Sequence, residues 1–381
     1  MGRDLLPCDG PLVVSYGAGV DSTAMLVLLH REGIRPDRII FADVGSESPD
    51  TYVTVGIMHR WCKDVGFPGV TVVRYEPKRA PYTTLHGNCL ANDTLPGLSF
   101  GPSSCSIKWK HGPLDADVLA WKPAKRALRE GRRVIRAIGY DNSPADRKRF
   151  GAWAKREEKR QAEGKGENRW EFWYPLQSVW GLERPDLIAI IRKEMGDEFE
   201  RSISARCCPK SACFFCPAAR PEEVFDLARR HPDLALLAAV IEYRAETGKH
   251  GLSKCNGLGL TRTKADKGPE DTKPRNWSWR ARLVAEGLLP TDWKGLAVRA
   301  GLLPDDWGKY ANKVARLRKE IEEAEKAEDT ATAAALKRAK KALRAPDWTD
   351  RTEPEPEHWE ALVASVDEDH GPEFCHPIRG A

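Results

Sequence analysis

The sequence predicts an α/β protein: a twisted parallel sheet with helices on both faces, followed by a mainly helical C-terminal extension. Three observations support this prediction. Short apolar runs of β character alternate with segments of helical spacing in the N-terminal part of the chain. Hydrophobic residues make up 41% of the sequence, which suits a soluble protein with a packed core. No apolar run approaches the roughly 20 residues that span a bilayer. An α+β arrangement of the same elements is the open alternative.

The predicted elements follow one another in a regular order. Residues 11–15 form an apolar run, 16–20 a glycine-containing loop, 21–30 a segment of helical spacing and 38–42 a second apolar run. Further strands are predicted at 70–74 and 134–139, with helices at 49–65 and 114–130. Because parallel strands must be joined by crossovers, usually helices, this alternation favours a parallel sheet.

A domain boundary is predicted near residue 260, dividing the chain into residues 1–260 and 261–381. Beyond it, the segment 285–293 is repeated as 299–307, fourteen residues later, and both copies contain Gly-Leu-Leu-Pro-x-Asp-Trp. Two copies are too few for a solenoid. The residues from Lys309 to Ala345 are rich in Ala, Lys, Glu and Arg. They predict one long helix or a helical hairpin broken near Asp329-Thr330.

The charge balance is mildly basic, with 61 Lys and Arg against 56 Asp and Glu, and does not by itself indicate nucleic acid. Residues 122–160 hold 14 basic and five acidic side chains. This stretch either contacts a polyanion or forms a solvated helix face, and about 148–170 is expected to be an exposed, mobile insertion. The N-terminus lacks the apolar core of a signal peptide, so a cytoplasmic location is expected, in the host cell if the protein is phage-encoded.

Four of the ten cysteines lie between residues 207 and 216. Such clustering in a long chain predicts a metal or redox site in a reducing compartment. Cys213 and Cys216 form a C-x-x-C pair, whose two thiolates can bind one metal or cluster from a single turn. The open alternative is that the cysteines are simply reduced, two of them buried.

Residues 15–23 (Ser-Tyr-Gly-Ala-Gly-Val-Asp-Ser-Thr) predict a phosphate-binding loop between a strand and a helix. Small residues let the backbone approach an anion, and the amides at the following helix N-terminus point toward it. Ser22 and Thr23 can donate hydrogen bonds to phosphate, and Asp21 can help to hold Mg²⁺ or cap the helix. The loop has neither the Walker pattern nor G-x-G-x-x-G, and an ordinary tight strand–helix turn is the alternative.

This loop resembles the PP-loop of ATP pyrophosphatases, whose pattern is Ser-Gly-Gly-x-Asp-Ser. Residues 17–22 read Gly-Ala-Gly-Val-Asp-Ser. Gly17 replaces the serine of the pattern, and Ala18 replaces its first glycine. Both replacements are small, so the anion cradle is kept while one hydroxyl contact is lost.

Other segments are similar to the phosphoadenosine phosphosulfate reductase-like branch of this superfamily. The matching segments are residues 41–51 (Asp-Thr-Gly-x-x-x-Pro-Glu-Thr in the branch), 105–114 (Cys-x-x-x-x-Lys-x-x-Pro-Leu), 139–147, and 211–217, which holds a cysteine pair common in phage-borne members. Within 139–147, Pro144 stands where the branch usually has an acidic residue. The resemblance covers roughly residues 10–245, and the five motifs occur in the family's order.

The resemblance implies a nucleotide-binding fold that holds ATP with Mg²⁺, or the phosphosulfate of an adenylyl sulfate. The implied nucleotide contacts are Ser15, Gly17, Ala18, Gly19, Val20, Asp21, Ser22, Thr23, Asp43 and Gly45. Asp43 and Gly45 are expected beside the ribose or the adenine edge, because open parallel sheets bind ligands at the carboxyl ends of their strands. Asp21, Lys110 and Arg147 are the implied catalytic residues, the two cations neutralising phosphate charge. On spacing alone, Lys110 is equally well a solvated surface lysine.

For the metal, related enzymes combine a cysteine from the region of residue 105 with the C-x-x-C pair. The implied ligand set is therefore Cys105, Cys208, Cys213 and Cys216, with Cys207 as a substitute for Cys208. A [4Fe–4S] cluster is the leading expectation. Structural Zn²⁺ is the alternative, because four thiolates suit both.

The implied function is ATP-dependent adenylation, in which a substrate oxygen attacks the α-phosphorus and pyrophosphate leaves. Sulfur or another nucleophile then displaces AMP. A nucleic acid is a candidate substrate, a sulfur-carrying protein a candidate donor, and no membrane partner is expected. One alternative is a sulfonucleotide reductase, although Cys375-His376 lacks the glycine and histidine spacing of that class's C-terminal Glu-Cys-Gly-x-His. The other is a non-catalytic nucleotide- or nucleic-acid-binding module.

Overall fold

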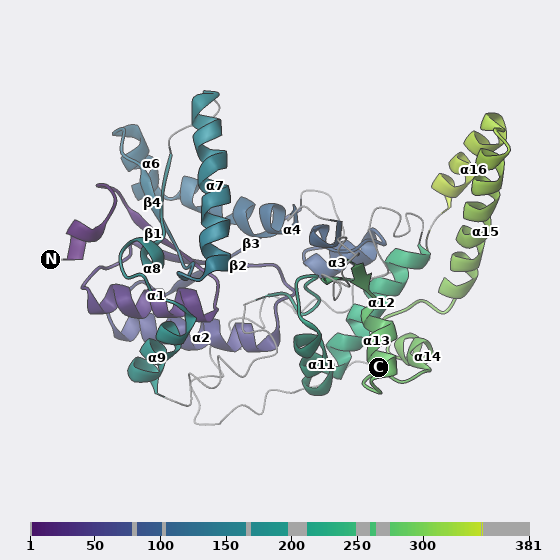
Figure 1. Ribbon diagram of the computed structural model, residues 1–381, viewed down its shortest axis with the longest axis horizontal. Coiled ribbons are helices and arrows are strands. Elements are labelled where there is room, and N and C mark those ends of the chain that lie inside the picture. The colour runs from purple at the N-terminus through teal and green to yellow at the C-terminus, as the bar shows by residue number, and fades with distance from the viewer. Residues whose placement is uncertain are drawn as a thin grey trace. The chain divides into compact units, whose positions relative to one another are not determined.

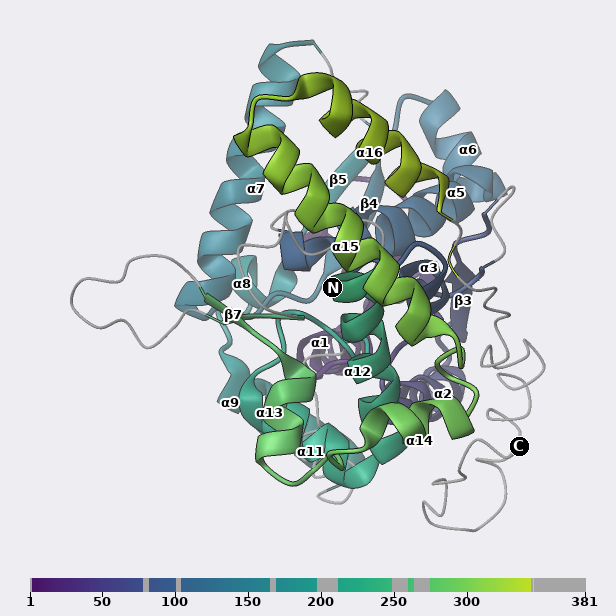
Figure 2. The same ribbon diagram turned by 90° about the vertical axis from the view of Figure 1, so that its right-hand side faces the viewer.

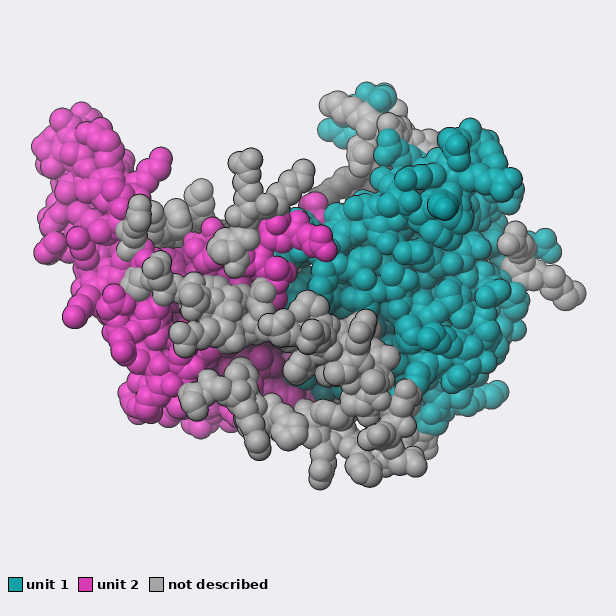
Figure 3. Space-filling view, turned by 180° about the vertical axis from the view of Figure 1, so that it is seen from behind, with its two compact units in different colours: residues 1–75, 108–212, 355–370 teal, residues 76–107, 213–354, 371–381 magenta. Residues whose placement is uncertain are grey.

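The computed structural model describes residues 2–77, 82–100, 104–164, 169–196, 212–248, 260–263, 275–343 and 345. Contacts between residues divide the chain into two compact units, coloured separately in Figure 3. Unit 1 takes its described residues from 2–75 and 108–212, and unit 2 from 76–107 and 213–345. The second unit thus includes two segments that precede residue 260, and the domain boundary expected there stays a prediction.

Unit 1 is built on a five-stranded sheet in which every pairing is parallel (Figure 1). Its strands are β1 (Leu12–Tyr16), β2 (Arg38–Asp43), β3 (Val70–Arg74), β4 (Val134–Ile138) and β5 (Trp170–Trp173), in the order β3-β2-β1-β4-β5. The predicted α/β class is confirmed, and four of these strands are those the sequence predicts. The fifth, β5, was not predicted.

Helices cover both faces of this sheet, as the sequence predicts. Leu12 and Val14 of β1 belong to one hydrophobic cluster, together with residues of α1, α2 and α9. Val13, between them, belongs to a second cluster with residues of α5 and α6. Successive strand residues point to opposite faces, so β1 separates two cores. The helices are α1 (Val20–Arg31), α2 (Pro49–Asp64), α5 (Gly112–Ala120), α6 (Lys122–Arg129), α7 (Pro144–Ala162), α8 (Pro175–Ser178) and α9 (Arg184–Met195), with a 3₁₀ turn at Gly2–Leu5 and a π-helical turn at Ile107–His111.

The order of the strands creates a switch point between β1 and β4. The chain runs from β1 to β2 and β3 on one side, and then returns to place β4 on the other side of β1. Open parallel sheets bind ligands at the carboxyl ends of the strands at such a point. The loops that follow β1 and β4 are therefore the expected walls of a site.

Two predicted elements differ in the structure. The helix expected over 114–130 is two helices, α5 and α6, with Trp121 in extended conformation between them. Pro123 explains the break, because a proline inside a helix removes a hydrogen bond and clashes with the preceding turn. The segment expected to be an insertion over about 148–170 is largely α7, with Lys148 and Arg149 exposed. Whether it is mobile stays a prediction.

Unit 2 is helical around α12, in which every residue from Ala235 to Glu242 is buried. Three buried tryptophans, fourteen residues apart, are the first residues of α13, α14 and α15, and each of these helices contacts α12. The Trp293 ring meets the Tyr243 ring edge-on, with the centroids 5.5 Å apart. Trp307 Nε1 donates to Thr247 Oγ1 at 3.0 Å. The unit comprises α3 (Leu85–Ala91), a 3₁₀ turn (Gly97–Phe100), α4 (Ser104–Ser106), α11 (Pro221–Arg230), α12 (Pro232–Thr247), β6 (Thr261–Thr263), β7 (Arg275–Trp277), α13 (Trp279–Ala285), α14 (Trp293–Arg299), α15 (Trp307–Lys326) and α16 (Thr330–Ala342).

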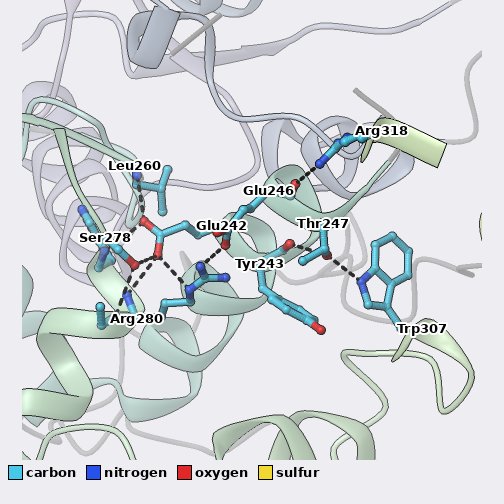
Figure 4. Close-up of polar contacts among 11 residues, drawn as sticks. Glu242, Tyr243, Glu246, Thr247, Leu260, Ser278, Arg280, Trp307 and Arg318 are labelled. Atoms are coloured by element: carbon cyan, nitrogen blue, oxygen red, sulfur yellow. Dashed lines mark hydrogen bonds and ion pairs between the residues drawn. The ribbon is translucent and has the colours of Figure 1, made fainter. Parts of the chain in front are cut away.

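The Glu242 side chain of α12 forms hydrogen bonds with the start of α13 (Figure 4). Its fully buried carboxylate accepts from the amides of Leu260 (2.8 Å), Trp279 (2.9 Å) and Arg280 (3.1 Å), and from Ser278 Oγ (2.5 Å). Burial raises the pKa of Glu242, while the hydrogen bonds from Ser278 and Leu260 oppose that rise. The carboxylate thus supplies acceptors to amides that the short helix α13 cannot satisfy internally.

The C-terminal helices form a hairpin, which is one of the two arrangements that the sequence predicts. Figure 2 shows α15 and α16 side by side, and the Asp329 side chain accepts from the Thr332 amide at the start of α16. This places the break where the sequence predicts it. None of the helices in the described part of the chain combines the length and the hydropathy of a membrane-spanning segment.

Candidate functional site

The loop between β1 and α1 folds back on itself through the side chain of Ser22. The Gly17 amide donates to Ser22 Oγ at 3.2 Å, and Ser22 Oγ donates to the Gly19 carbonyl at 3.3 Å. The Thr23 amide donates to the same carbonyl at 3.0 Å. Helix α1 begins at Val20 without a side-chain cap. The first amides of a helix have no acceptor within it, which makes this end suitable for an anion.

Ala18 holds a backbone conformation that favours glycine, with φ at +56°. For a residue with a side chain this conformation costs about 1–2 kcal/mol. The methyl group is buried in the core on the α1 face of the sheet, and burial of one such group offsets about 0.8 kcal/mol. The rest of the strain is retained at the loop, and such strain often accompanies functional sites.

Two side-chain hydroxyls among the predicted nucleotide contacts have partners inside the protein. Thr23 is fully buried, and its Oγ1 shares a hydrogen bond of 3.2 Å with the Tyr16 hydroxyl. Ser15 Oγ accepts from Arg136 Nε of β4 at 3.0 Å. In the β1 alternation Ser15 falls on the same face as Val13, opposite α1. The structure therefore leaves the amides of the loop and of the first turn of α1 as its main means of holding an anion.

Three carboxylates from separate elements meet at the switch point. Asp21 is in the first turn of α1, Asp141 follows β4, and Asp146 is in the first turn of α7. One oxygen of each lies within 4.8 Å of those of the other two, and Asp141 is buried. Carboxylate oxygens are the ligands that Mg²⁺ prefers. Acidic groups of this kind also occur without a metal, so the distances alone do not assign one.

Two arginines neutralise part of this acidic group. Arg184 Nη1 lies 3.5 Å from Asp21 Oδ1, and Arg149 Nη1 lies 2.9 Å from Asp146 Oδ1. Arg147, which the sequence predicts to act on phosphate, is exposed beside Asp146 in the first turn of α7. The site therefore combines carboxylates, which can bind a metal ion, with arginines on its border, which can pair with phosphate.

Asp43 ends β2 with its carboxylate occupied by the protein. It is buried, and Oδ1 accepts from the Gly45 amide at 2.7 Å and from the Tyr52 hydroxyl at 2.8 Å. Oδ2 accepts from Arg74 Nε at 2.7 Å. Burial, and then the nearby carboxylates of Asp43 and Glu47, raise the pKa of Tyr52 well above its ordinary value, so the phenol stays a donor. These contacts give Asp43 a structural role in the turn. Its contact with ribose stays a prediction.

Lys110 is paired with Glu47, a carboxylate that is not among the predicted site residues. Its Nζ lies 2.7 Å from Glu47 Oε1, and the Lys110 side chain is 34% exposed while that of Glu47 is fully buried. The Ser46-Glu47-Ser48 run follows the end of β2 after two intervening residues and is buried throughout. A buried polar run at the carboxyl end of a strand is a signal that sequence alone does not reveal, because burial depends on the fold.

The predicted cysteine ligands are partly described. Cys105, Cys213 and Cys216 are half-buried, and the Cys216 amide donates to the Cys213 carbonyl at 3.0 Å, which closes the C-x-x-C turn. Cys208 and its substitute Cys207 lie outside the described residues. Zinc bonded to thiolates at about 2.3 Å holds them about 3.8 Å apart. Within the described residues, only the three aspartates bring three metal-ligating atoms within 4.8 Å, so the described cysteines do not form a zinc group by themselves. The [4Fe–4S] cluster stays a prediction.

A cavity of about 440 Å³ opens in unit 2 among α12, α13 and α14. Tyr243 and Trp293 form part of its lining, and Lys294 Nζ lies 4.5 Å from the centre of the Tyr243 ring. It contains none of the residues that the sequence predicts as functional.

No protein-family model matches the chain, and no curated protein matches it either.

Proposed function

We propose that unit 1 is an ATP-dependent adenylating enzyme of the PP-loop type. The observation that carries this proposal is the meeting of two features at the switch point of a parallel sheet: a turn of small residues at the start of α1, and the group of Asp21, Asp141 and Asp146. Magnesium nucleotides need amide donors for their phosphates and oxygen ligands for the metal. The site offers both within adjoining loops.

In the proposed reaction, a substrate oxygen forms a bond to the α-phosphorus of ATP, and the bond from that phosphorus to the bridging oxygen of pyrophosphate breaks. The loop amides hold the phosphates and restrict the angle of attack. The three aspartates would hold Mg²⁺, which screens the phosphate charge when it is bound. Arg147 is exposed and Lys110 is partly exposed, and their positive charges neutralise the departing pyrophosphate.

The second half of the proposed reaction is displacement of AMP by sulfur or another nucleophile. Nucleic acid stays the proposed acceptor, with a sulfur-carrying protein as the donor. The exposed basic residues of α7 support a polyanionic acceptor, since they extend from the border of the site. The cysteines take no part in the proposed reaction: Cys208 lies outside the described residues, and Cys105, Cys213 and Cys216 do not bring three ligand atoms together.

The test is calorimetric titration with ATP and Mg²⁺, followed by measurement of pyrophosphate release. Asp21→Ala should abolish release, while Asp292→Ala, at a side chain 74% exposed in unit 2, should leave it unchanged. Absence of ATP binding by the wild-type protein would overturn the proposal. Release of sulfite from phosphoadenosine phosphosulfate, without pyrophosphate release from ATP, would favour the sulfonucleotide reductase instead.

A further inference from the structure

Glu47 has one carboxylate oxygen that the protein leaves without a partner. Its side chain is fully buried, and Oε1 pairs with Lys110 Nζ at 2.7 Å. Oε2 is buried and accepts no hydrogen bond from any described residue. A buried carboxylate oxygen has lost its hydration. When no hydrogen bond replaces the lost water, the free energy of desolvation is uncompensated and destabilises the folded protein.

The next residue, Ser48, repeats the pattern. Its Oγ is buried and has no partner among the described residues. Ser48 precedes α2 but does not cap it with its side chain. Pro49 at the start of α2 has no amide hydrogen, and the Thr51 amide is taken by the Ser48 carbonyl at 2.8 Å. The Ser48 hydroxyl is therefore buried at the start of α2 without a hydrogen-bond partner among the described residues.

The neighbouring acid, Asp43, cannot serve the same purpose without losing its own contacts. Both of its oxygens accept hydrogen bonds that hold the turn, from Gly45, Tyr52 and Arg74. Glu47 is held by fewer contacts and has the free oxygen. Between the two carboxylates after β2, the one that can accept from a ligand is Glu47.

The two unpartnered atoms stand at the carboxyl end of β2, the strand next to β1. Tyr16, the last residue of β1, pairs with Phe41 of β2, so the loop after β1 and the turn after β2 leave the same edge of the sheet. Open parallel sheets bind ligands at the carboxyl ends of their strands, and in the dinucleotide-binding members an acidic side chain that follows a neighbouring strand contacts the ribose. A ribose hydroxyl can donate to a carboxylate and accept from a serine.

We propose that Glu47 Oε2 and Ser48 Oγ bind the ribose hydroxyls of the nucleotide, which rests on the function proposed above. A ribose hydroxyl donates to Glu47 Oε2 and accepts from Ser48 Oγ. The carboxylate is already desolvated, so the ligand gains the hydrogen bond without stripping water from the acceptor. Lys110 is the exposed member of the ion pair, so the sugar approaches Glu47 from the side of Lys110.

The experiment compares the dissociation constants of ATP, 2′-deoxy-ATP and 3′-deoxy-ATP, with inosine triphosphate as the arm that tests the base. The wild-type protein should bind at least one deoxy analogue about tenfold or more weakly than ATP, a ratio equivalent to about 1.4 kcal/mol. In Glu47→Gln and in Ser48→Ala this ratio should fall toward one. The ratio is the readout because release of Lys110 from Glu47 changes the affinity for all triphosphates alike.

Ser48→Ala keeps the test available if Glu47→Gln does not fold. Glu130→Gln, at a solvent-exposed ion pair, is the matched control and should retain the wild-type ratio. Equal binding of ATP and both deoxy analogues, or a ratio unchanged in the two variants, would overturn the assignment while leaving the proposed function intact. A Glu47-dependent preference for ATP over inosine triphosphate, without sugar discrimination, would place the base there instead. Failure of ATP itself to bind would overturn the proposed function and this assignment together.

Discussion

Gly139 lies against the backbone of Ser22: a Cβ atom at Gly139 would come within 2.8 Å of the Ser22 amide nitrogen and 2.9 Å of its Cα. Gly139 directly follows β4, and Ser22 is in the first turn of α1. The two loops at the switch point are thus in backbone contact, and only a glycine permits this approach. The contact fixes the position of the phosphate loop relative to Asp141 across the site.

Gly139→Ala should destabilise the protein by about 1–3 kcal/mol, the usual cost of forcing an extra carbon into a packed site. The atoms it meets are backbone, which cannot rotate away. Denaturant unfolding monitored by circular dichroism measures the change. The matched control is Gly151→Ala in α7, where a Cβ meets no atom within 4 Å. That variant should be neutral or stabilising by up to about 1 kcal/mol, because alanine favours helix. Equal destabilisation by both changes would contradict the packing argument.

Magnesium should stabilise the wild-type protein through its three clustered aspartates. Binding at about 100 times the dissociation constant adds about 2.7 kcal/mol to the free energy of unfolding. Asp141→Asn should remove most of this gain. Without metal, the variant should be at least as stable as the wild type, because it relieves repulsion among carboxylates within 4.8 Å. Thermal unfolding with and without Mg²⁺ measures both effects. An undiminished Mg²⁺ response in the variant, with Asp292→Asn as the reference, would rule out this site.

The two copies of the repeat in unit 2 should respond alike to the same change. Gly287 and Gly301 occupy equivalent positions, with φ of +66° and +70°, and a Cβ added at either would meet no atom within 4 Å. Gly287→Ala and Gly301→Ala should therefore each cost about 1–2 kcal/mol from backbone conformation alone. Gly308→Ala, in α15 and without a positive φ, should cost nothing. Chemical denaturation of the three variants gives the comparison, and a loss at Gly308 equal to the others would contradict it.

Cys62 should resist alkylation in the native protein. It is fully buried on α2, and burial raises its pKa to about 12. At pH 8 only about one thiol in ten thousand is then ionised, and the fraction rises about tenfold with each pH unit below the pKa. Mass spectrometry after iodoacetamide treatment should find Cys62 unmodified in native protein and modified in urea. Comparable rates in both conditions at pH 8 would contradict the prediction.

Much of unit 1 could be predicted because its signals are local. Residues 11–45 carry a strand, a loop, a helix and a second strand in contiguous sequence, and each is present in the structure. The strand β5 was missed because Trp170–Trp173 is short and follows a highly charged segment. Cation–π contacts with β4 help to hold β5 in the sheet. The Arg136 guanidinium lies 5.5 Å from the centre of the Trp170 ring and 5.8 Å from the centre of the Phe172 ring. This partner is on β4, so the stabilisation is invisible to a local pattern.

The site was predictable only as far as its residues are neighbours in sequence. Asp21 could be identified from the loop motif, but its grouping with Asp141 and Asp146 depends on β4 lying beside β1. Pro144 stands where an acidic residue was expected, and Asp146, two residues later, supplies a carboxylate from the next part of the same turn. Glu47 was overlooked because its importance comes from burial and from an unpaired oxygen, which are properties of the folded chain.

The regular placement of Trp279, Trp293 and Trp307 along α12 has a consequence for how this chain can vary. Each fourteen-residue segment contains its own helix start, its own glycine turn and its own aromatic anchor. An in-frame tandem duplication or deletion of one segment would therefore add or remove a helix start, a glycine turn and a tryptophan together. The length of α12 limits such growth, because each added helix must contact α12 as α13, α14 and α15 do.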